Sequence, residues 1–421
     1  MQKLAYTILC FFLMAATSGQ DTTEQIVPGR MNSLTQQQKP YVILISADGF
    51  RHDFAEKYQA KNLLQLRKKG ATAAYMTASF PSLTFPNHYT IVTGLYPAHH
   101  GLVDNSFVDF NRKQTYTMAN KEMVADPYWY GGTPLWVLAE QQQMIAAGFY
   151  WVASEAPIQN LPPTYYYIYN EKISIDARIE KIKQWLALPE DKRPHFISFY
   201  FSDVDHAAHT HGPDSKETAE AVRFVDENIG RLNAVAESSG LPVNFVFVAD
   251  HGMTEVDHQH TLAYPTSIDT SKFFINNGNA VVQLYAKDQS AIYGMYQQLK
   301  SEAQDYDVYL KADMPEKFHY QPRDDRFNRI GDIILLAKLP KIFNRQGRPT
   351  SPGKHGYDPT FPDMRASFQA WGPAFKEGLK IDGFENIHIY PMIATILGLT
   401  YEASKIDGKK EVLRGVLKTE K

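Results

Sequence analysis

The chain has 421 residues, of which 44% are hydrophobic and 21% are charged, and these fractions are typical of a globular protein and exclude a disordered or fibrous one. The 43 basic and 46 acidic residues give a net charge of -3, so we expect no nucleic-acid-binding surface, and an anionic substrate must bind at a local site. At about 150 residues per domain, the length fits two to three domains or one large α/β domain with insertions.

The first 20 residues have the pattern of a secretory signal peptide. Lys3 precedes an apolar stretch over residues 4–16, and small residues follow as far as Gly19. The apolar stretch is too short to span a bilayer as a finished helix. Cys10 is the single cysteine and lies within this stretch, so the mature chain would hold no disulfide. We expect a secreted or periplasmic protein with no stable membrane anchor in the mature chain.

The rest of the chain alternates between strand-like and helix-like segments. Residues 21–39 are polar and are predicted to form a linker. After them, short apolar runs suited to buried strands (41–45, 195–201 and 244–248) alternate with amphipathic stretches (62–69, 177–188 and 216–237). This alternation predicts an α/β catalytic domain over residues 40–415, with a mostly parallel central sheet and helices on both faces. A detour over about 257–354 has strand-like and helix-like segments of its own and is predicted to be a smaller inserted subdomain.

Metal-ligating side chains follow all three of these strands. Asp48 comes after the first, Asp205 and His209 after the second, and Asp250 and His251 after the third. Ligands of open α/β sheets bind beyond the carboxyl ends of the strands. Each residue alone is more typical of a solvated loop or a helix cap. Together they predict a polynuclear metal site at one edge of the sheet.

A threonine precedes the helix-like run that ends at Gly94. Thr84 begins this run, and Pro86 lies in its first turn, where proline is tolerated. Thr84 fits the role of a helix N-cap. It also fits a functional role, because free N–H groups and the helix dipole favour a phosphate at a helix N-terminus. Local sequence physics leaves both roles open.

Four long motifs resemble those of the ecto-nucleotide pyrophosphatase/phosphodiesterase family, the type I phosphodiesterases of the alkaline phosphatase superfamily. They occur in the family's order within roughly residues 40–400. The motifs are residues 84–97 followed by His100, Gly101 and Asn105; residues 193–196 leading to Asp205, His209 and Gly212; residues 249–253; and residues 354–357. The resemblance implies an alkaline phosphatase-like fold. It also implies a bacterial-type single catalytic domain, without the cysteine-rich and nuclease-like domains of vertebrate members.

The resemblance further implies a two-metal centre and a nucleophile. Carried over position by position, it assigns to one metal ion Asp48, Thr84, Asp250 and His251, and to the other Asp205, His209 and His355. Imidazoles mixed with carboxylates suit Zn²⁺ better than Mg²⁺, so the expected cofactor is two zinc ions. Thr84 would be the nucleophile and would form a phosphothreonine intermediate. Helix N–H groups after Thr84 would help to stabilise the charge on the phosphoryl oxygens.

The same resemblance places a substrate pocket beside Thr84. The amide of Asn105 would donate to one phosphate oxygen and leave room for a second ester group, which favours diesters over monoesters. Phe85 and Tyr169 would lie on either side of a nucleotide base, and Trp151 would lie at the rim of the pocket. Tyr169 belongs to a tyrosine cluster over residues 165–169 that fits an aromatic core or strand as well.

The expected function is therefore that of an exported, monomeric two-zinc nucleotide pyrophosphatase/phosphodiesterase, which would cleave ATP to AMP and pyrophosphate. The alternative is a lysophospholipid or choline phosphodiesterase of the same family. A third reading is a non-catalytic binding protein of this fold. The pair Phe85 and Tyr169 favours a planar base, and the intact set of ligand positions favours an enzyme.

Overall fold

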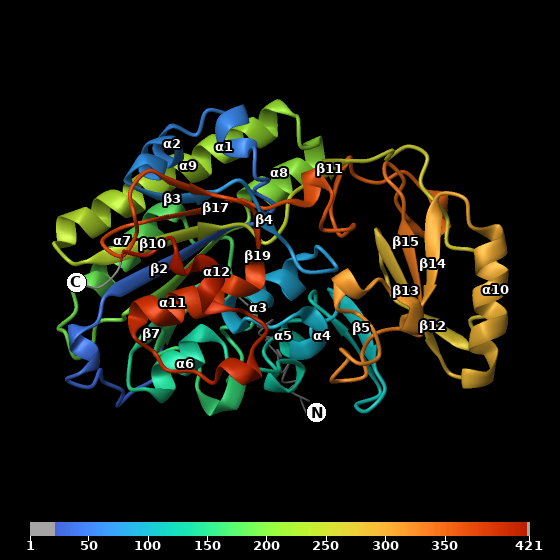
Figure 1. Ribbon diagram of the computed structural model, residues 1–421, viewed down its shortest axis with the longest axis horizontal. Coiled ribbons are helices and arrows are strands. Elements are labelled where there is room, and N and C mark those ends of the chain that lie inside the picture. Colours follow the sequence, from blue (N-terminus) through green and yellow to red (C-terminus); the bar gives the residue numbers. More distant parts are fainter. Residues whose placement is uncertain (1–21, 419–421) are drawn as a thin grey trace, which may run out of the picture.

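The structure is a computed structural model that describes residues 22–418. A large sheet covered by helices lies beside a smaller unit made of a second sheet and one helix (Figure 1). The predicted signal peptide falls on residues 1–20, outside the described residues. Within residues 22–418, no helix has both the length and the apolar composition needed to cross a bilayer.

The large sheet has nine strands in the order β1-β8-β7-β9-β2-β10-β17-β3-β18. Five neighbouring strands run parallel, namely β8 (Tyr165–Tyr166), β7 (Ala146–Phe149), β9 (Phe196–Phe201), β2 (Tyr41–Ala47) and β10 (Val243–Val248). Next to β10, β17 (Phe368–Trp371) is antiparallel to both β10 and β3 (Gly70–Ala73), and β18 (Leu379–Ile381) is parallel to β3. The predicted mostly parallel sheet is confirmed.

Helices cover both faces of this sheet, as predicted (Figure 1). One face carries α2 (Lys61–Leu66), α7 (Ile175–Leu186) and α9 (Lys216–Ser239), and the other carries α3 (Thr84–Thr93), α6 (Leu135–Gln141) and α11 (Ile389–Leu397). Every residue of β2 and β10 is buried, because both sides of these strands are covered. This is why their sequences are continuous apolar runs without alternation.

Residues 257–354, for which we predicted an inserted subdomain, hold the smaller sheet. Its order is β12-β13-β15-β14, all antiparallel, with the strands β12 (Phe273–Ile275), β13 (Val281–Ala286), β14 (Tyr306–Leu310) and β15 (Ile333–Ala337), and with the helix α10 (Ile292–Glu302). The unit has its own apolar core, which includes Val282, Leu284 and Leu335. The chain leaves through β11 (Thr254–Glu255) and returns through β16 (Gly353–Lys354), and these two strands pair.

Residues 22–39 differ from the linker predicted for them, because they pack onto the catalytic domain. β1 (Gln25–Ile26) pairs with the edge strand β8. The Asn32 side chain is 4% exposed and donates to the carbonyls of Glu190 and Arg193 at 2.8 and 2.7 Å. Its Oδ1 accepts the N–H of Ile145 at 2.7 Å. A polar side chain is stable in the interior when it satisfies backbone groups, so the polar composition was a poor guide here.

Candidate active site

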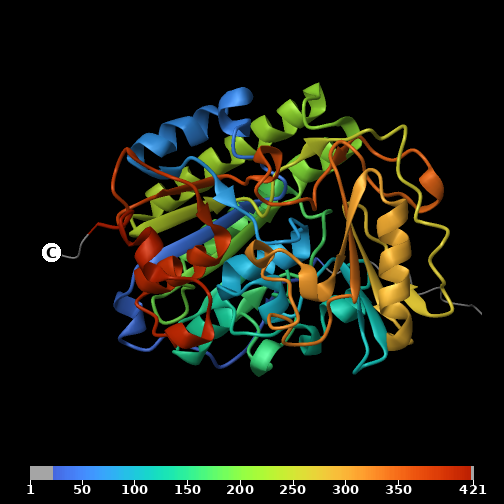
Figure 2. The same ribbon diagram turned by 45° about the vertical axis from the view of Figure 1, so that its right-hand side comes forward.

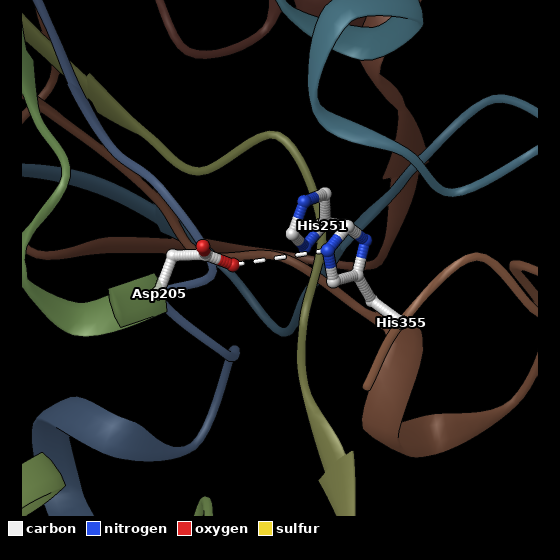
Figure 3. A group of neighbouring side chains, drawn as sticks. All are labelled: Asp205, His251 and His355. Atoms are coloured by element: carbon white, nitrogen blue, oxygen red, sulfur yellow. Dashed lines mark ion pairs between the residues drawn. The ribbon is translucent and has the colours of Figure 1, made fainter. Parts of the chain in front are cut away.

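The predicted ligands meet at one edge of the large sheet, although they come from distant parts of the sequence. Asp48 follows β2, Asp250 and His251 follow β10, Asp205 and His209 lie on α8 (Asp203–His211), and His355 follows β16. Asp205, His251 and His355 point toward one another from these separate segments (Figure 3). The carboxyl ends of parallel strands share one edge, and this is why motifs roughly 300 residues apart build a single site.

The first group surrounds the Nε2 atom of His251. This nitrogen lies 2.9 Å from Asp250 Oδ2 and 3.4 Å from Asp48 Oδ1. Thr84 Oγ1 lies 3.2 Å from the same nitrogen. The structure thus brings together the four residues assigned to one metal ion.

The second group is built on α8 and on the strand that returns from the inserted subdomain. Asp205 Oδ1 lies 3.4 Å from His209 Nε2 and 3.8 Å from His355 Nε2, and the two nitrogens are 3.1 Å apart. The rings of His251 and His355 stack with their centroids 3.6 Å apart, so the two groups are contiguous. His251 also lies close enough to Asp205 and His355 to share a metal ion with them.

The three histidines of the site are all oriented by backbone carbonyls. Their Nδ1 atoms lie 2.7 to 2.9 Å from the oxygens of Gly353, Gly252 and Ser82, for His209, His251 and His355 respectively. An Nδ1–H that donates to a carbonyl leaves the lone pair on Nε2, the arrangement found in histidine metal ligands. The two lone pairs of His209 and His355 then face each other at 3.1 Å and repel unless a cation lies between them.

The carboxylates of the site have buried oxygens that accept no hydrogen bond within residues 22–418. These are Asp48 Oδ1, Asp205 Oδ1 and Asp250 Oδ2. A buried, unpaired carboxylate is costly, and burial raises the pKa of Asp48 and brings that of Asp205 to about 8. Burial also lowers the pKa of His209 to about 4 and keeps its ring in the neutral, ligating form. The residues therefore fit metal cations.

Two supporting groups hold the other carboxylate oxygens. The hydroxyl of Tyr200 donates to Asp48 Oδ2 at 2.7 Å, and the N–H of Gly49 donates to Asp250 Oδ1 at 3.2 Å. Gly49 has a φ of 66°, and a Cβ there would lie 3.2 Å from the Cα of Asp205. Glycine is favoured here because φ is positive and because the turn after β2 approaches α8 closely. Tyr200 was missed because no sequence signal distinguishes it from the other aromatic residues of β9.

The N-cap role proposed for Thr84 is wrong. Thr84 is the first residue of α3, and its N-cap is Leu83, whose side chain makes no capping hydrogen bond. The Thr84 hydroxyl is instead turned toward His251. His88, one turn further along α3, supports this end of the helix, since its Nδ1 lies 3.0 Å from the carbonyl oxygen of Thr84 and its Nε2 lies 2.8 Å from Ser46 Oγ. The sequence patterns assign no role to His88.

The backbone donors expected after Thr84 are not free. The N–H of Phe85 donates to Asn105 Oδ1 at 3.0 Å, Pro86 has no N–H, and the N–H of Asn87 donates to the Leu83 carbonyl at 3.1 Å. The bond to Phe85 fixes the Asn105 amide next to the threonine. Asn105 Nδ2 has no hydrogen-bond partner within residues 22–418, so both of its N–H groups remain available as donors.

An aromatic cavity of about 320 Å³ opens beside Thr84, and Asp48 and Asp205 lie in its wall. The two residues predicted to lie on either side of a base, Phe85 and Tyr169, both line it, and so does Trp151, which was predicted at its rim. Tyr169 is held by a hydrogen bond from its hydroxyl to Glu171 Oε1 at 2.7 Å and by ring-edge contacts with Tyr150 and Tyr200. Trp151 is 4% exposed and donates through Nε1 to the His88 carbonyl at 2.9 Å, so it lies in the wall of the cavity rather than at its rim.

Sequence comparison shows that this chain is similar to known phosphodiesterases. The model of the type I phosphodiesterase / nucleotide pyrophosphatase family matches residues 42–358. Venom phosphodiesterase 2 of Crotalus adamanteus is 34% identical over 377 residues, which cover 86% of this chain and 46% of that protein. Ectonucleotide pyrophosphatase/phosphodiesterase family member 3 of Bos taurus is 32% identical over 370 residues, 85% of this chain and 42% of that protein. The chain spans about half the length of these curated relatives.

Solved structures of similar fold cover nearly the whole chain. Human ectonucleotide pyrophosphatase/phosphodiesterase 5 superposes with a TM-score of 0.84 at 27% identity, over 91% of this chain and 100% of that one. An inactive threonine-to-alanine variant of the murine protein, in complex with AMP, superposes with a TM-score of 0.84 at 26% identity, over 90% and 100%. The predicted alkaline phosphatase-like fold is confirmed. The chain belongs to the type I phosphodiesterase / nucleotide pyrophosphatase family.

Proposed function

We propose that this protein is an exported two-zinc nucleotide pyrophosphatase/phosphodiesterase that acts through a phosphothreonine intermediate. The observation that carries the proposal is the position of the Thr84 hydroxyl. It lies 3.2 Å from His251 Nε2, where a buried cluster of metal-ligating side chains meets an aromatic cavity. A hydroxyl, a metal-binding cluster and a base-sized cavity at one point suit phosphoryl transfer from a nucleotide.

The ligand set favours zinc. We assign to one ion Asp48, Thr84, Asp250 and His251, and to the other Asp205, His209 and His355. Imidazole nitrogens together with carboxylate oxygens suit Zn²⁺, whereas Mg²⁺ prefers oxygens and water. When bound, two zinc ions would supply Lewis-acid activation of hydroxyl groups and stabilisation of negative charge on the phosphoryl oxygens.

Thr84 carries the covalent chemistry. Its Oγ1 releases its proton to solvent and bonds to the substrate phosphorus, while the bond from phosphorus to the leaving oxygen breaks and the leaving group departs with that electron pair. A water molecule then attacks the phosphorus of the phosphothreonine from the side that the leaving group vacated, and the Thr84 hydroxyl is restored. Two in-line displacements predict net retention of configuration at phosphorus.

Asn105 selects the phosphodiester. Because its Oδ1 is held by the Phe85 N–H, its Nδ2 presents two donors to a phosphoryl oxygen. An amide is neutral, so it suits a diester with one negative charge better than a monoester with two. We therefore expect diesters and phosphoanhydrides such as ATP to be hydrolysed much faster than phosphate monoesters.

The cavity favours a nucleoside as the bound group. Its volume of about 320 Å³ lies within the range of small-ligand pockets, and aromatic rings stack on any nucleobase. The AMP complex of the murine neighbour supports the same assignment. ATP would then bind with its adenosine in the cavity and yield AMP and pyrophosphate.

A second candidate substrate is a choline phosphodiester or lysophospholipid. The carboxylates of Glu155 and Glu171 line the cavity together with Trp151 and Tyr169. Aromatic rings and carboxylates bind quaternary ammonium groups well. Values of kcat/KM for ATP, a dinucleotide and lysophosphatidylcholine, measured under one condition, separate the two substrate classes.

The product of ATP hydrolysis and a threonine variant test the proposal together. We expect AMP and pyrophosphate, retention at a chiral phosphorothioate diester, and a loss of at least about 1000-fold in kcat for Thr84→Ala. Thr84→Ser should keep part of the activity, because it retains a hydroxyl. The control is Thr93→Ala in the same helix, since Thr93 Oγ1 donates to the Tyr89 carbonyl and does not face the site. Release of ADP and phosphate, or inversion at phosphorus, would contradict the mechanism.

A further inference from the structure

The inserted subdomain forms hydrogen bonds with the residues on either side of Asn105 in the sequence. The Asp104 side chain is 4% exposed, and its Oδ2 accepts hydrogen bonds from Asn276 Nδ2 and Gln283 Nε2, each at 3.1 Å. Its Oδ1 accepts the N–H of Ser106 at 3.1 Å. Asn276 Nδ2 also lies 3.3 Å from the Ser106 carbonyl oxygen. The residues before and after Asn105 are therefore both bonded to the inserted subdomain.

The two amides are themselves fixed within the small sheet. Gln283 lies in β13, and its N–H donates to Asn276 Oδ1 at 2.8 Å. Its Oε1 accepts the N–H of Gly331 at 2.9 Å. Each amide thus has its oxygen occupied by a backbone N–H, so its nitrogen is directed at Asp104. Neither amide group can flip, exchanging its oxygen and nitrogen, without breaking a buried hydrogen bond.

Tyr320 adds a third contact from the inserted subdomain. Its hydroxyl donates to the Val103 carbonyl at 2.7 Å and accepts from Gln283 Nε2 at 3.1 Å. Tyr320 and Gln283 are fully buried, so water does not compete for these bonds. The inserted subdomain therefore holds the chain at residues 103, 104 and 106, which lie on either side of Asn105 in the sequence.

A buried ion pair keeps the inserted subdomain in place beside this loop. Arg329 Nε lies 2.9 Å from Asp109 Oδ2, and both side chains are 1% exposed. Asp109 ends β5 (Ser106–Asp109), the strand that follows Asn105. The hairpin of β5 and β6 (Gln114–Thr117) lies alongside the small sheet in both views (Figures 1 and 2). Removing one partner of a fully buried pair is strongly destabilising, so this pair contributes to the contact between the inserted subdomain and β5.

We propose that the inserted subdomain positions Asn105 for phosphate binding, through the contacts of Asn276, Gln283 and Tyr320 with residues 103–106. Asp104 is a positioning residue: it does not face the cavity, and it holds the neighbouring amide where its Nδ2 reaches the substrate. This inference rests on the proposed function, because it assumes that Asn105 binds the phosphoryl group. A shift of about 1 Å in a substrate-binding group reduces turnover by about 100-fold, so rigid support of this loop has a catalytic consequence.

A double-mutant cycle between Asp104→Asn and Asn105→Ala tests the proposal, with kcat/KM measured for a diester and a monoester. Asn105→Ala should lower the diester value by about 100-fold, the usual effect of losing one donor to a charged transition state. Asp104→Asn should lower the diester kcat/KM by about tenfold and should also lower the ratio of the diester value to the monoester value. The reason is that the amide nitrogen of the introduced asparagine would face the amide donors of the inserted subdomain. In the Asn105→Ala background, Asp104→Asn should have no further effect on either value.

Two further variants distinguish positioning from a merely structural role. Gln283→Glu added to Asp104→Asn offers an acceptor to the new amide, and it should restore part of the diester-to-monoester ratio. Asp332→Asn is the control, because Asp332 accepts the Ala286 N–H within the small sheet and does not contact the Asn105 loop; its ratio should stay unchanged. Metal content and Tm are recorded for every variant.

The outcomes separate the two proposals. If Asn105→Ala leaves the diester kcat/KM unchanged, the role of Asn105 in the proposed function is wrong. If Asn105→Ala lowers it and Asp104→Asn does not, the positioning role of Asp104 is wrong. Multiplicative losses in the double variant, with a constant diester-to-monoester ratio for Asp104→Asn, would also overturn the positioning role.

Discussion

Tyr200, a residue outside the predicted set, orients one carboxylate of the proposed metal site. Its hydroxyl donates to Asp48 Oδ2, and this leaves Oδ1 of the same carboxylate directed into the cluster. Hydrogen bonds of this kind orient a ligand and raise its affinity for the metal. The histidine ligands receive the same support from the carbonyls of Ser82, Gly252 and Gly353.

Tyr200→Phe should therefore weaken metal binding while the packing of the ring is kept. We expect the zinc dissociation constant of one site to rise by about tenfold or more. Competition with a chromophoric zinc chelator measures this directly. Tyr58→Phe serves as the control, because the Tyr58 hydroxyl donates to the Pro213 carbonyl, away from the ligands. Equal zinc affinities for the two variants would contradict the role of Tyr200.

Tyr169→Ala tests the base-binding role of the cavity. The loss of one stacking contact, about 1.4 kcal/mol, should raise KM for ATP by about tenfold. Steady-state kinetics with ATP and with a nitrophenyl phosphodiester, which has no base, measure the effect. KM for the second substrate should change little. If Tyr169 belonged only to the aromatic core, both substrates would be affected to the same extent.

At the scale of elements, the start of α11 depends on a histidine that stays neutral. His388 precedes α11, and its Nδ1 accepts the N–H of Lys409 at 3.0 Å, which ties α11 to the C-terminal segment. Burial, together with the nearby charge of Lys409, lowers the pKa of His388 to about 4. The contact with Lys409 gives His388 a structural role.

The lowered pKa of His388 predicts that the protein loses stability in acid. Below about pH 6.5 the unfolded chain binds a proton on His388 that the folded protein does not bind, so stability falls as the pH drops from there to about 4. His388→Asn keeps an acceptor for the Lys409 N–H but does not titrate. Measured from pH 7.5 to pH 4, its Tm should fall less steeply than that of the unmodified protein. If the Tm of both proteins falls equally steeply with pH, His388 does not contribute to the loss of stability in acid.

At the scale of the whole molecule, the proposed metal site joins the large sheet, α8 and the segment that returns from the inserted subdomain. Its ligands follow β2, β10 and β16 and lie on α8, so bound metal would link the large sheet to the segment returning from the inserted subdomain. Without a cation, the buried carboxylate oxygens and the facing imidazole lone pairs repel one another.

Removal of metal should therefore lower the thermal stability of the entire protein. At a free zinc concentration 100 times the dissociation constant, binding contributes about 2.7 kcal/mol, which amounts to several degrees in Tm. Thermal unfolding measured with and without a chelator tests this. Added Zn²⁺ should restore the Tm and the activity, whereas Mg²⁺ alone should not. Full recovery with Mg²⁺ would contradict the assignment of zinc.

Several features followed from the sequence alone. The α/β class, the strands at β2, β9 and β10 and the family were predicted correctly, because buried strands and long motifs are local patterns along the chain. The same local patterns predict the ligand positions, since each of them follows a strand or lies within a motif, and the assignment of these residues to two metal ions stays a prediction.

Only the tertiary structure decided how these residues act. The hydroxyl of Thr84 faces His251 instead of capping its helix. Residues 22–39 pack against the catalytic domain instead of forming a linker. The amide of Asn105 is oriented by Phe85, and its loop is held by Gln283, 178 positions later. The physical reason is that a hydrogen bond between distant residues depends on how separate elements pack, and no local pattern in the sequence encodes that geometry.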